Sequence, residues 1–320
     1  MTAMGIRWRM RAMLRQNMDN LLVSWPIYGA VRQFQNAAAQ KLFQQERARL
    51  APSPIEQTIV TQLRRDGIAQ IDFDQLVPSP AFAELSAWAE SLANREDVRR
   101  DIDARISGVI PPNTKGGKYY VVRPLGDAPV YDIHDLVVRF ALSTPILRIV
   151  SNYLGLLSRI TALDLWYNLP TRGPEIFSQR WHRDPEDRAI VKTFLYLRDC
   201  NESNGPFCYI PGTHNAGILR HKVGRDNYPE DGVVDRKYSP EQQRVCTGKA
   251  GTLIFCDTTG FHKGGNPREG ARYLFNTVYT SNASEPIVKR WTPQCTVHGA
   301  LEGLDTAQQY AARFVHGSRE

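Results

Sequence analysis

The chain has 320 residues, of which 42% are hydrophobic and 23% charged, which is the composition of a globular protein. That composition excludes a disordered tail, a collagen-like repeat and a coiled coil, and the lack of a long apolar run excludes a spanning helix. The net charge is +7, and residues 1–50 account for +6 of it, so the basic character belongs to one end of the chain.

Residues 1–50 are predicted to form a basic amphipathic helical extension. Apolar residues such as Met10, Leu14 and Met18 recur at three-to-four spacing, while Arg7 and Arg11 fall on another face. The first helix should end near Pro26, and a second, weaker one should follow over 27–43.

Three interpretations of this extension remain open. It packs on the body or on a partner subunit, it lies on an anionic membrane surface as a peripheral contact, or it is a cleaved targeting signal. No nucleic-acid-binding motif accompanies the charge, so nucleic acid is not expected as a partner.

Residues 51–320 are predicted to form a single domain that begins with helices. The pattern predicts helices over 55–65, 80–103 and 132–154, the last with Pro145 inside it, and strands over 68–73 and 118–123.

From about residue 160 to 285 the pattern changes to short β-rich runs separated by turn residues. The expected strands are 160–168, 176–181, 189–197, 207–210, 252–256 and 273–280. This spacing is typical of an antiparallel barrel or sandwich, and helices followed by strands indicate an α+β fold in which N-terminal helices buttress the β core. The polar stretch over 215–249 is too long for a plain hairpin and is interpreted as a lid.

The five cysteines include no CxxC pair. They therefore suggest neither a disulfide framework nor a zinc knuckle, and free thiols indicate a reducing compartment, most simply the cytoplasm.

The residues with the most specific chemistry are two histidines and an aspartate. His182 and Asp184 share the spacing that puts two side chains on one face of a strand, although this motif alone is common by chance. His262 follows the expected strand 252–256, and Arg272 starts the next one. Two histidines and one carboxylate form the facial triad of non-haem Fe(II) oxygenases, and Arg272 offers a planar fork for a carboxylate.

This series resembles the phytanoyl-CoA dioxygenase family of Fe(II)/2-oxoglutarate oxygenases over about residues 55–285. The matching motifs are RRDGIA at 64–69, WHRD at 181–184, FLYLRD at 194–199, NGP at 204–206, PGTH at 211–214 and GTLIF at 251–255, followed by His262 and Arg272. His214, within PGTH, is expected to stabilise a turn rather than to bind metal.

The resemblance implies a double-stranded β-helix, the jelly-roll or cupin-like fold. It implies Fe(II) on His182, Asp184 and His262, and 2-oxoglutarate and O₂ as co-substrates, with the distal carboxylate of the keto acid on Arg272. Tyr167 and Phe194 fall where the family lines the keto-acid pocket, although both also fit as plain core aromatics.

Two positions bear on how far the resemblance extends. The family often has Ser or Thr two residues after the distal histidine, whereas this chain has Gly264, so one hydrogen bond to the keto acid is missing or supplied elsewhere. Related halogenases replace the ligating carboxylate with Gly or Ala, and Asp184 argues against that chemistry.

The resemblance implies hydroxylation of an unactivated C–H bond of a small-molecule or lipid-linked substrate, such as a glycolipid or an acyl chain, with release of succinate and CO₂. Two alternatives remain. A zinc hydrolase or cupin isomerase could use the same three ligands, but it would leave Arg272 without a role. A non-catalytic barrel could act as a membrane-associated binding module, and iron and 2-oxoglutarate binding would distinguish it.

Overall fold

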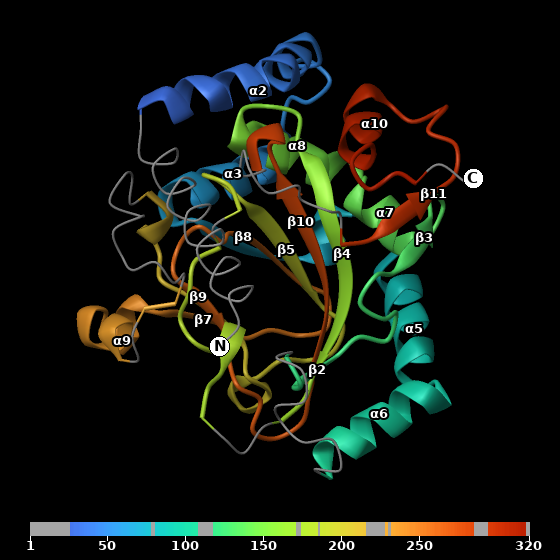
Figure 1. Cartoon of the computed structure of the whole chain (residues 1–320), viewed down its shortest axis with the longest axis vertical. Helices are drawn as coiled ribbons and strands as arrows, with labels where there is room; N and C mark the ends of the chain where they lie inside the picture. The colour runs from blue at the N-terminus through green and yellow to red at the C-terminus, as the bar shows by residue number, and fades with distance from the viewer. Residues whose placement is uncertain are drawn as a thin grey trace, which may run out of the picture.

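A computed structural model describes residues 26–77, 81–107, 118–170, 174–184, 186–215, 228–229, 232–284 and 294–317 (Figure 1). Its first half is largely helical, with short strands between the helices. In chain order it contains α2 (Pro26–Gln45), α3 (Pro54–Asp66), β1 (Ile68–Asp72), α4 (Phe73–Leu76), α5 (Ala81–Ala93), α6 (Glu96–Ile106), β2 (Val121–Val122), β3 (Val130–Asp132), α7 (Leu136–Ala141) and α8 (Thr144–Leu154).

The second half is dominated by strands and short 3₁₀ turns. It contains β4 (Arg159–Asn168), η1 (Phe177–Gln179), β5 (Val191–Tyr196), η2 (Glu202–Asn204), β6 (Phe207–Tyr209), η3 (Thr213–Asn215), α9 (Val233–Lys237), η5 (Pro240–Gln242), β7 (Arg244–Cys246), β8 (Thr252–Asp257), β9 (His262–Gly264), β10 (Arg272–Thr280), η6 (Asn282–Ser284), β11 (Thr296–His298) and α10 (Thr306–Ala312).

Two antiparallel sheets form the β core. The major sheet has the order β1-β8-β5-β10-β4-β2, and the minor sheet has the order β7-β6-β9. From β5 onward the chain passes repeatedly between the two sheets, with β6 and β7 in the minor sheet, β8 in the major sheet, β9 in the minor sheet and β10 in the major sheet. This is the arrangement of a double-stranded β-helix, so the predicted α+β fold with a jelly-roll core is confirmed. A small parallel pair, β3 with β11, lies beside the helices.

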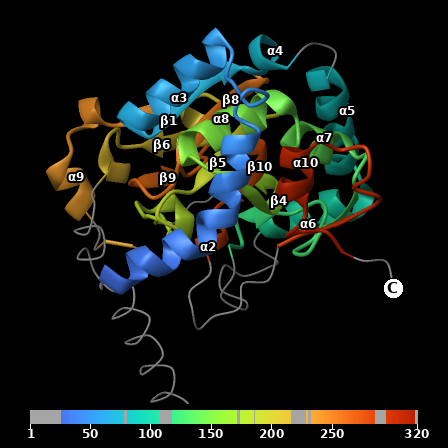
Figure 2. The ribbon, with the colours of Figure 1, turned by 90° about the horizontal axis from the view of Figure 1, so that it is seen from above.

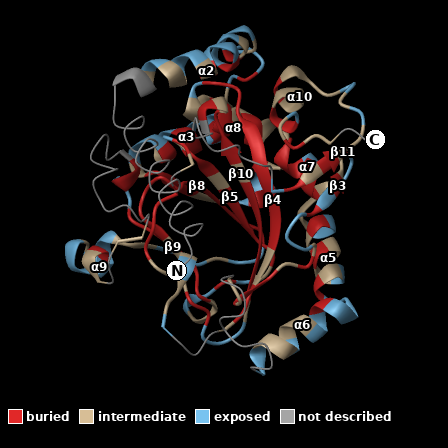
Figure 3. Cartoon of the chain, in the orientation of Figure 1, coloured by how far each residue is buried: buried red, intermediate tan, exposed pale blue. Residues whose placement is uncertain are grey.

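The two faces of the major sheet have different surroundings because side chains alternate along a strand. On one face, residues such as Leu165, Leu195 and Phe275 pack with α3, α5, α7, α8 and α10 in a large apolar core. On the other face, Phe194 and Leu274 meet Phe207 of the minor sheet. Figure 3 shows that β4, β5 and β10 are buried along most of their length.

Three expected elements differ from the structure. The predicted helix 132–154 is two helices, because Pro145 lies in the first turn of α8, where its missing N–H costs nothing. The predicted helix 80–103 is interrupted between α5 and α6, and the predicted strand 176–181 is the 3₁₀ turn η1. The expected helix before Pro26 lies outside the described residues.

Helix α2, the expected second helix of the extension, lies across one end of the β core (Figure 2). Arg32 forms an ion pair with Asp187, whose side chain is fully buried. Asn36 donates a hydrogen bond to the hydroxyl of Ser281, just after β10, at 3.2 Å. These contacts fasten α2 to the loop that follows Asp184 and to the end of β10.

All five cysteines are free and buried. Burial raises the pKa of the Cys208 thiol to about 11 and that of Cys246 to about 12. Among the described residues, the helices include none with both the length and the apolar character needed to cross a bilayer.

Candidate metal centre

His182, Asp184 and His262 come together between the two sheets. One ligand atom from each residue lies within 4.8 Å of the others, and all three residues are buried. The backbones of His182 and His262 form an antiparallel bridge, in which the amide nitrogen of each residue lies 2.9 or 3.0 Å from the carbonyl oxygen of the other. The amide of Asp184 donates to the carbonyl of Thr258 at 2.9 Å. The backbone itself therefore sets the spacing of the three side chains.

Hydrogen bonds orient both imidazoles toward the same point. Nδ1 of His182 lies 2.8 Å from the carbonyl oxygen of Arg180, and Nδ1 of His262 lies 3.0 Å from that of Gly260. A carbonyl accepts only, so each Nδ1 carries the proton and each Nε2 presents a lone pair. This is the arrangement that orients metal-binding histidines.

The protonation states of the triad also suit a cation. Burial lowers the pKa of both histidines, that of His182 well below its ordinary value, so both rings are neutral. Burial by itself would raise the pKa of Asp184, but the ammonium of Lys192, 2.6 Å from Oδ2, and the two imidazoles lower it. The site thus offers two neutral nitrogens and one carboxylate, a donor set that fits Fe(II) or Zn(II).

Arg183, between the two ligands in sequence, links three segments of the centre. Its guanidinium is buried against the ring of Phe261 and donates from Nη1 to the carbonyls of Thr213 and Thr259, at 2.8 and 2.7 Å. The hydroxyl of Thr213 accepts from the amide of Phe261 at 2.8 Å. The PGTH turn therefore holds the residue before His262, and Arg183 ties that turn to the loop that carries the ligands.

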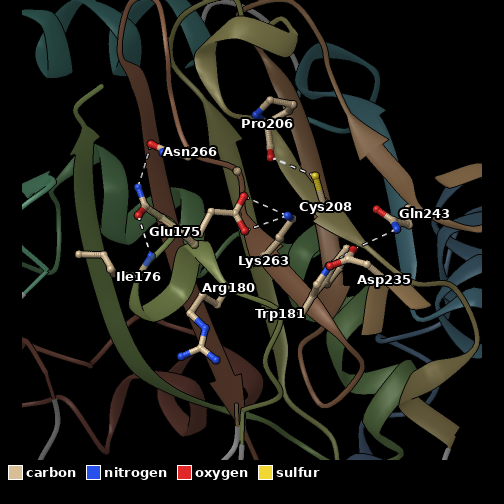
Figure 4. A network of polar contacts seen from close by, with 12 residues as sticks. Glu175, Ile176, Arg180, Trp181, Pro206, Cys208, Asp235, Gln243, Lys263 and Asn266 are labelled. Carbon is tan, nitrogen blue, oxygen red and sulfur yellow. Dashed lines mark hydrogen bonds and ion pairs between the residues drawn. The ribbon is translucent and has the colours of Figure 1, made fainter. Parts of the chain in front are cut away.

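A polar network on the far face of β9 secures the segment that leads to His182 (Figure 4). Lys263 Nζ lies 3.0 Å from both carboxylate oxygens of Glu175 and 5.2 Å from the centre of the Trp181 ring. Trp181 Nε1 in turn donates to Asp235 of α9 at 2.9 Å. The immediate neighbours of both histidines, Lys263 and Trp181, are therefore fixed on the side away from the metal position.

A cavity of about 340 Å³ opens beside the triad. Arg272, at the start of β10, lines it and is buried, with Nη1 3.4 Å from the carbonyl oxygen of Gly265. A Cβ built on Gly264 would lie only 2.9 Å from Nη2 of Arg272. The glycine that departs from the family pattern therefore leaves room for the guanidinium.

A hydroxyl pair lies next to this end of the cavity. The hydroxyls of Tyr120 and Ser178 are 2.8 Å apart, and both residues line the cavity with Arg272 and Gly264. They lie near Gly264, the position at which the family often has the hydroxyl of Ser or Thr.

The structure places Phe194 in this cavity but not Tyr167. Phe194 lies on the inner face of β5 and packs on Phe207. Tyr167 lies on the outer face of β4, where its hydroxyl accepts from Arg198 at 2.9 Å and its ring packs on Tyr273. The prediction for Tyr167 is therefore corrected, because its neighbours Trp166 and Asn168 are the inward residues of that strand.

Sequence reasoning missed several charged groups at the cavity. Lys118, Glu186 and Lys192 line it in addition to the predicted residues. Burial, together with the nearby charge of Asp184, raises the pKa of Glu186 to about 7. A usable signal was present in Lys192, because a lysine in the otherwise apolar strand β5 needs a buried partner.

Part of the predicted lid segment also reaches the centre. The ring of Tyr228 stacks on that of His182, with centroids 5.0 Å apart and an interplanar angle of 17°. His214, by contrast, is buried near Gly67 with Nε2 3.3 Å from the carbonyl oxygen of Arg64, away from the three ligands.

Fold and site together define the class: a double-stranded β-helix protein with a buried His-Asp-His cluster beside an arginine-lined cavity. The chain belongs to the phytanoyl-CoA dioxygenase (PhyH) family, whose model matches residues 30–271. A comparison with curated proteins found no match.

The solved structures that match this chain are distant in sequence. EctD from S. alaskensis with bound Fe is 19% identical, with 83% of this chain and 88% of that chain covered and a TM-score of 0.51. EctD from S. alaskensis with 2-oxoglutarate and 5-hydroxyectoine is 18% identical over 81% and 84%, with a TM-score of 0.50. The epimerase SnoN with Fe3+, alpha ketoglutarate and nogalamycin RO is 15% identical over 71% and 84%, at 0.45.

Proposed function

We propose that the protein is an Fe(II)- and 2-oxoglutarate-dependent dioxygenase that hydroxylates an unactivated C–H bond of a small molecule. One observation carries the proposal: the triad and Arg272 open into the same cavity. Membership of the family supports it, as does the likeness in fold to EctD, which was crystallised with Fe and with 2-oxoglutarate.

In this proposal His182, Asp184 and His262 hold the iron. Both imidazoles present Nε2, since Nδ1 of each is occupied by a backbone carbonyl. Lys192 neutralises part of the charge on Asp184 and fixes the rotamer of its carboxylate. Bound Fe(II), with O₂ and 2-oxoglutarate, would supply the oxidising chemistry and release succinate and CO₂.

Arg272 binds the distal carboxylate of the keto acid. Its guanidinium is buried, and Nε has no hydrogen-bond partner in the described part of the chain, so the group has unused donors for a planar anion. The Tyr120–Ser178 pair would supply the hydroxyl contact that Gly264 does not. Phe194 and Phe207 give this part of the cavity an apolar wall that keeps water away from the reacting groups.

Anaerobic calorimetry followed by a succinate assay tests the proposal. The protein should bind one Fe(II), then 2-oxoglutarate, and should turn the keto acid over slowly without a prime substrate. A zinc hydrolase would bind metal without needing the keto acid, and a non-catalytic module would release neither CO₂ nor succinate. Either result would overturn the proposed activity.

Hydroxylation is proposed because it is the default reaction of the family that the chain belongs to. Asp184 supplies the carboxylate that related halogenases lack, which argues against halogenation. Mass spectrometry of the product would show a gain of one oxygen atom. A product with no added oxygen, from epimerisation or ring closure, would replace hydroxylation with one of those reactions.

The predicted membrane contact and the lipid-linked class of substrate rest on the basic extension. Helix α2 is fastened to the body through Arg32 and Asn36, so the segment to remove in a test is 1–25. Sedimentation with anionic liposomes, with and without residues 1–25, decides the question. Equal sedimentation of both forms would leave a soluble substrate.

A further inference from the structure

The cavity wall carries more positive charge than the keto acid and the metal ligands explain. Of the residues that the structure describes, five with basic side chains line the cavity and two with carboxyl groups do. The basic residues are Lys118, Arg123, Arg183, Lys192 and Arg272, and the acidic ones are Asp184 and Glu186.

Most of these cations already have partners. Lys192 pairs with Asp184, and Arg183 donates to backbone carbonyls. Arg123 lies 3.2 Å from Asp127 and 3.5 Å from Asp164. Because these cations already have partners within the protein, they contribute little to binding an anionic ligand.

Lys118 is different. Among the described residues, no carboxylate lies within ion-pair distance of its ammonium, and Glu186 in the same wall is not close enough to neutralise it. Its Nζ lies 5.1 Å from the centre of the Trp166 ring. Burial, followed by the charge of Lys192, lowers the pKa of Lys118 to about 8. An uncompensated ammonium in such a position is costly unless an anion joins it.

The surroundings of Lys118 also separate it from the keto-acid end. Trp166, which the ammonium of Lys118 contacts, pairs with Leu274 of β10, whereas Arg272 pairs with Asn168, two residues further along β4. The guanidinium of Arg123 lies 6.0 Å from the centre of the same Trp166 ring, so two cations lie close to this aromatic side chain.

We propose that the prime substrate is a small molecule with a carboxylate or phosphate group, which Lys118 binds beside Trp166. This inference rests on the proposed function, because it places a second anion in a cavity that also takes 2-oxoglutarate. The volume of about 340 Å³ is at the low end for ligand pockets and must hold both molecules, which favours a compact polar metabolite. The bond to be oxidised would lie between Lys118 and the triad.

Protection of Lys118 from acetylation tests this directly in the wild-type protein. Protein loaded with Fe(II) and 2-oxoglutarate under anaerobic conditions is treated briefly with acetic anhydride near pH 8, and modification is read by peptide mass spectrometry. Orthophosphate or propionate should slow acetylation of Lys118 about threefold or more, since a bound anion keeps the amine protonated. Neutral propionamide should have no effect. Lys249, which is exposed and paired with Asp199, serves as the internal control.

Variants separate this inference from the proposed function. Lys118→Gln should still bind Fe(II) and 2-oxoglutarate and release succinate slowly, but should lose about tenfold or more in affinity for orthophosphate by calorimetry. Lys249→Gln should match the wild type. Unchanged phosphate affinity in Lys118→Gln, or no protection of Lys118 by either anion, would overturn the anionic substrate alone. Failure of the wild-type protein to bind 2-oxoglutarate would instead overturn the proposed function.

Discussion

The two sheets that enclose the cavity hold their site residues by different means. The major sheet presents Arg272, Phe194 and Lys192 from long, regular strands whose outer faces are buried under helices. The minor side presents the metal ligands from a three-residue strand and an isolated bridge. There, the short backbone bridge is reinforced by side-chain hydrogen bonds that Arg183 donates and Asp187 accepts. The residues of the major sheet are thus held by long strands, and the three ligands by a short bridge together with side-chain hydrogen bonds.

The largest expected effect comes from removing a ligand on the minor side. His182→Ala should abolish tight binding of Fe(II) and all 2-oxoglutarate turnover, because two ligands cannot complete the triad. His214→Asn, which changes a buried histidine outside the cluster, is the matched control for metal stoichiometry. Retention of iron and activity by His182→Ala would remove the metal assignment.

A change on the major sheet should separate the keto acid from the metal. Arg272→Gln should weaken 2-oxoglutarate binding by about 2 to 5 kcal/mol and leave Fe(II) affinity nearly unchanged, since a buried carboxylate loses its charged partner. Steady-state KM and anaerobic metal titration measure the two effects. Arg198→Gln, on the outer face of the same sheet, should leave KM as it is. Loss of iron with an unchanged KM would make Arg272 a structural residue.

A variant of Arg183 tests whether side-chain hydrogen bonds hold the three metal ligands in position. Arg183→Met removes two hydrogen bonds to backbone carbonyls and should lower metal affinity by about 10- to 100-fold, the usual effect of losing a group that orients a ligand. The KM for 2-oxoglutarate should change much less, and Arg183→Lys should recover part of the metal affinity. Equal losses in metal affinity and KM would contradict the division between the two sheets.

Removing the ion pair between Arg32 of α2 and Asp187, in the loop that follows Asp184, should have a smaller effect, mainly on stability. Arg32→Ala removes a charged partner of buried Asp187, which keeps hydrogen bonds from the amide and hydroxyl of Ser281, at 2.9 and 2.7 Å, and from the amide of Arg188, at 2.6 Å. The free energy of unfolding should therefore fall by about 1 to 3 kcal/mol. Denaturant melts measure it. Arg49→Ala removes an exposed pair with Asp305 and should cost about 0 to 1 kcal/mol. Equal costs would mean that α2 does not anchor the loop.

Tyr167→Phe should have the smallest effect. The change removes one hydrogen bond from Arg198 on the outer face and should cost about 0.5 to 1.5 kcal/mol of stability without altering the KM for 2-oxoglutarate. Phe194→Ala should raise that KM, because Phe194 faces the cavity. A raised KM in Tyr167→Phe would return Tyr167 to the keto-acid pocket.

Most of the regular helices and strands, and the site residues that lie on them, could be predicted from the sequence. Helix α3 and strands β1, β4, β5, β8 and β10 lie where apolar periodicity places them, and the spacing of His182, Asp184, His262 and Arg272 marks the site. Tyr167 was misplaced because a one-residue error in strand phase moves a side chain to the opposite face. Lys118, Arg183 and Glu186 could not be assigned from sequence, because their roles depend on which distant carbonyls and charges surround them.

The burial of the five thiols bears on the lifetime of the protein in air. Oxidation of cysteine proceeds through the thiolate, and apolar burial keeps Cys208 and Cys246 protonated far above neutral pH. These two cysteines therefore present very little thiolate for O₂ to oxidise. Slow inactivation during idle turnover should leave the thiol count intact, and titration of the denatured protein with a thiol reagent would still find all five cysteines reduced.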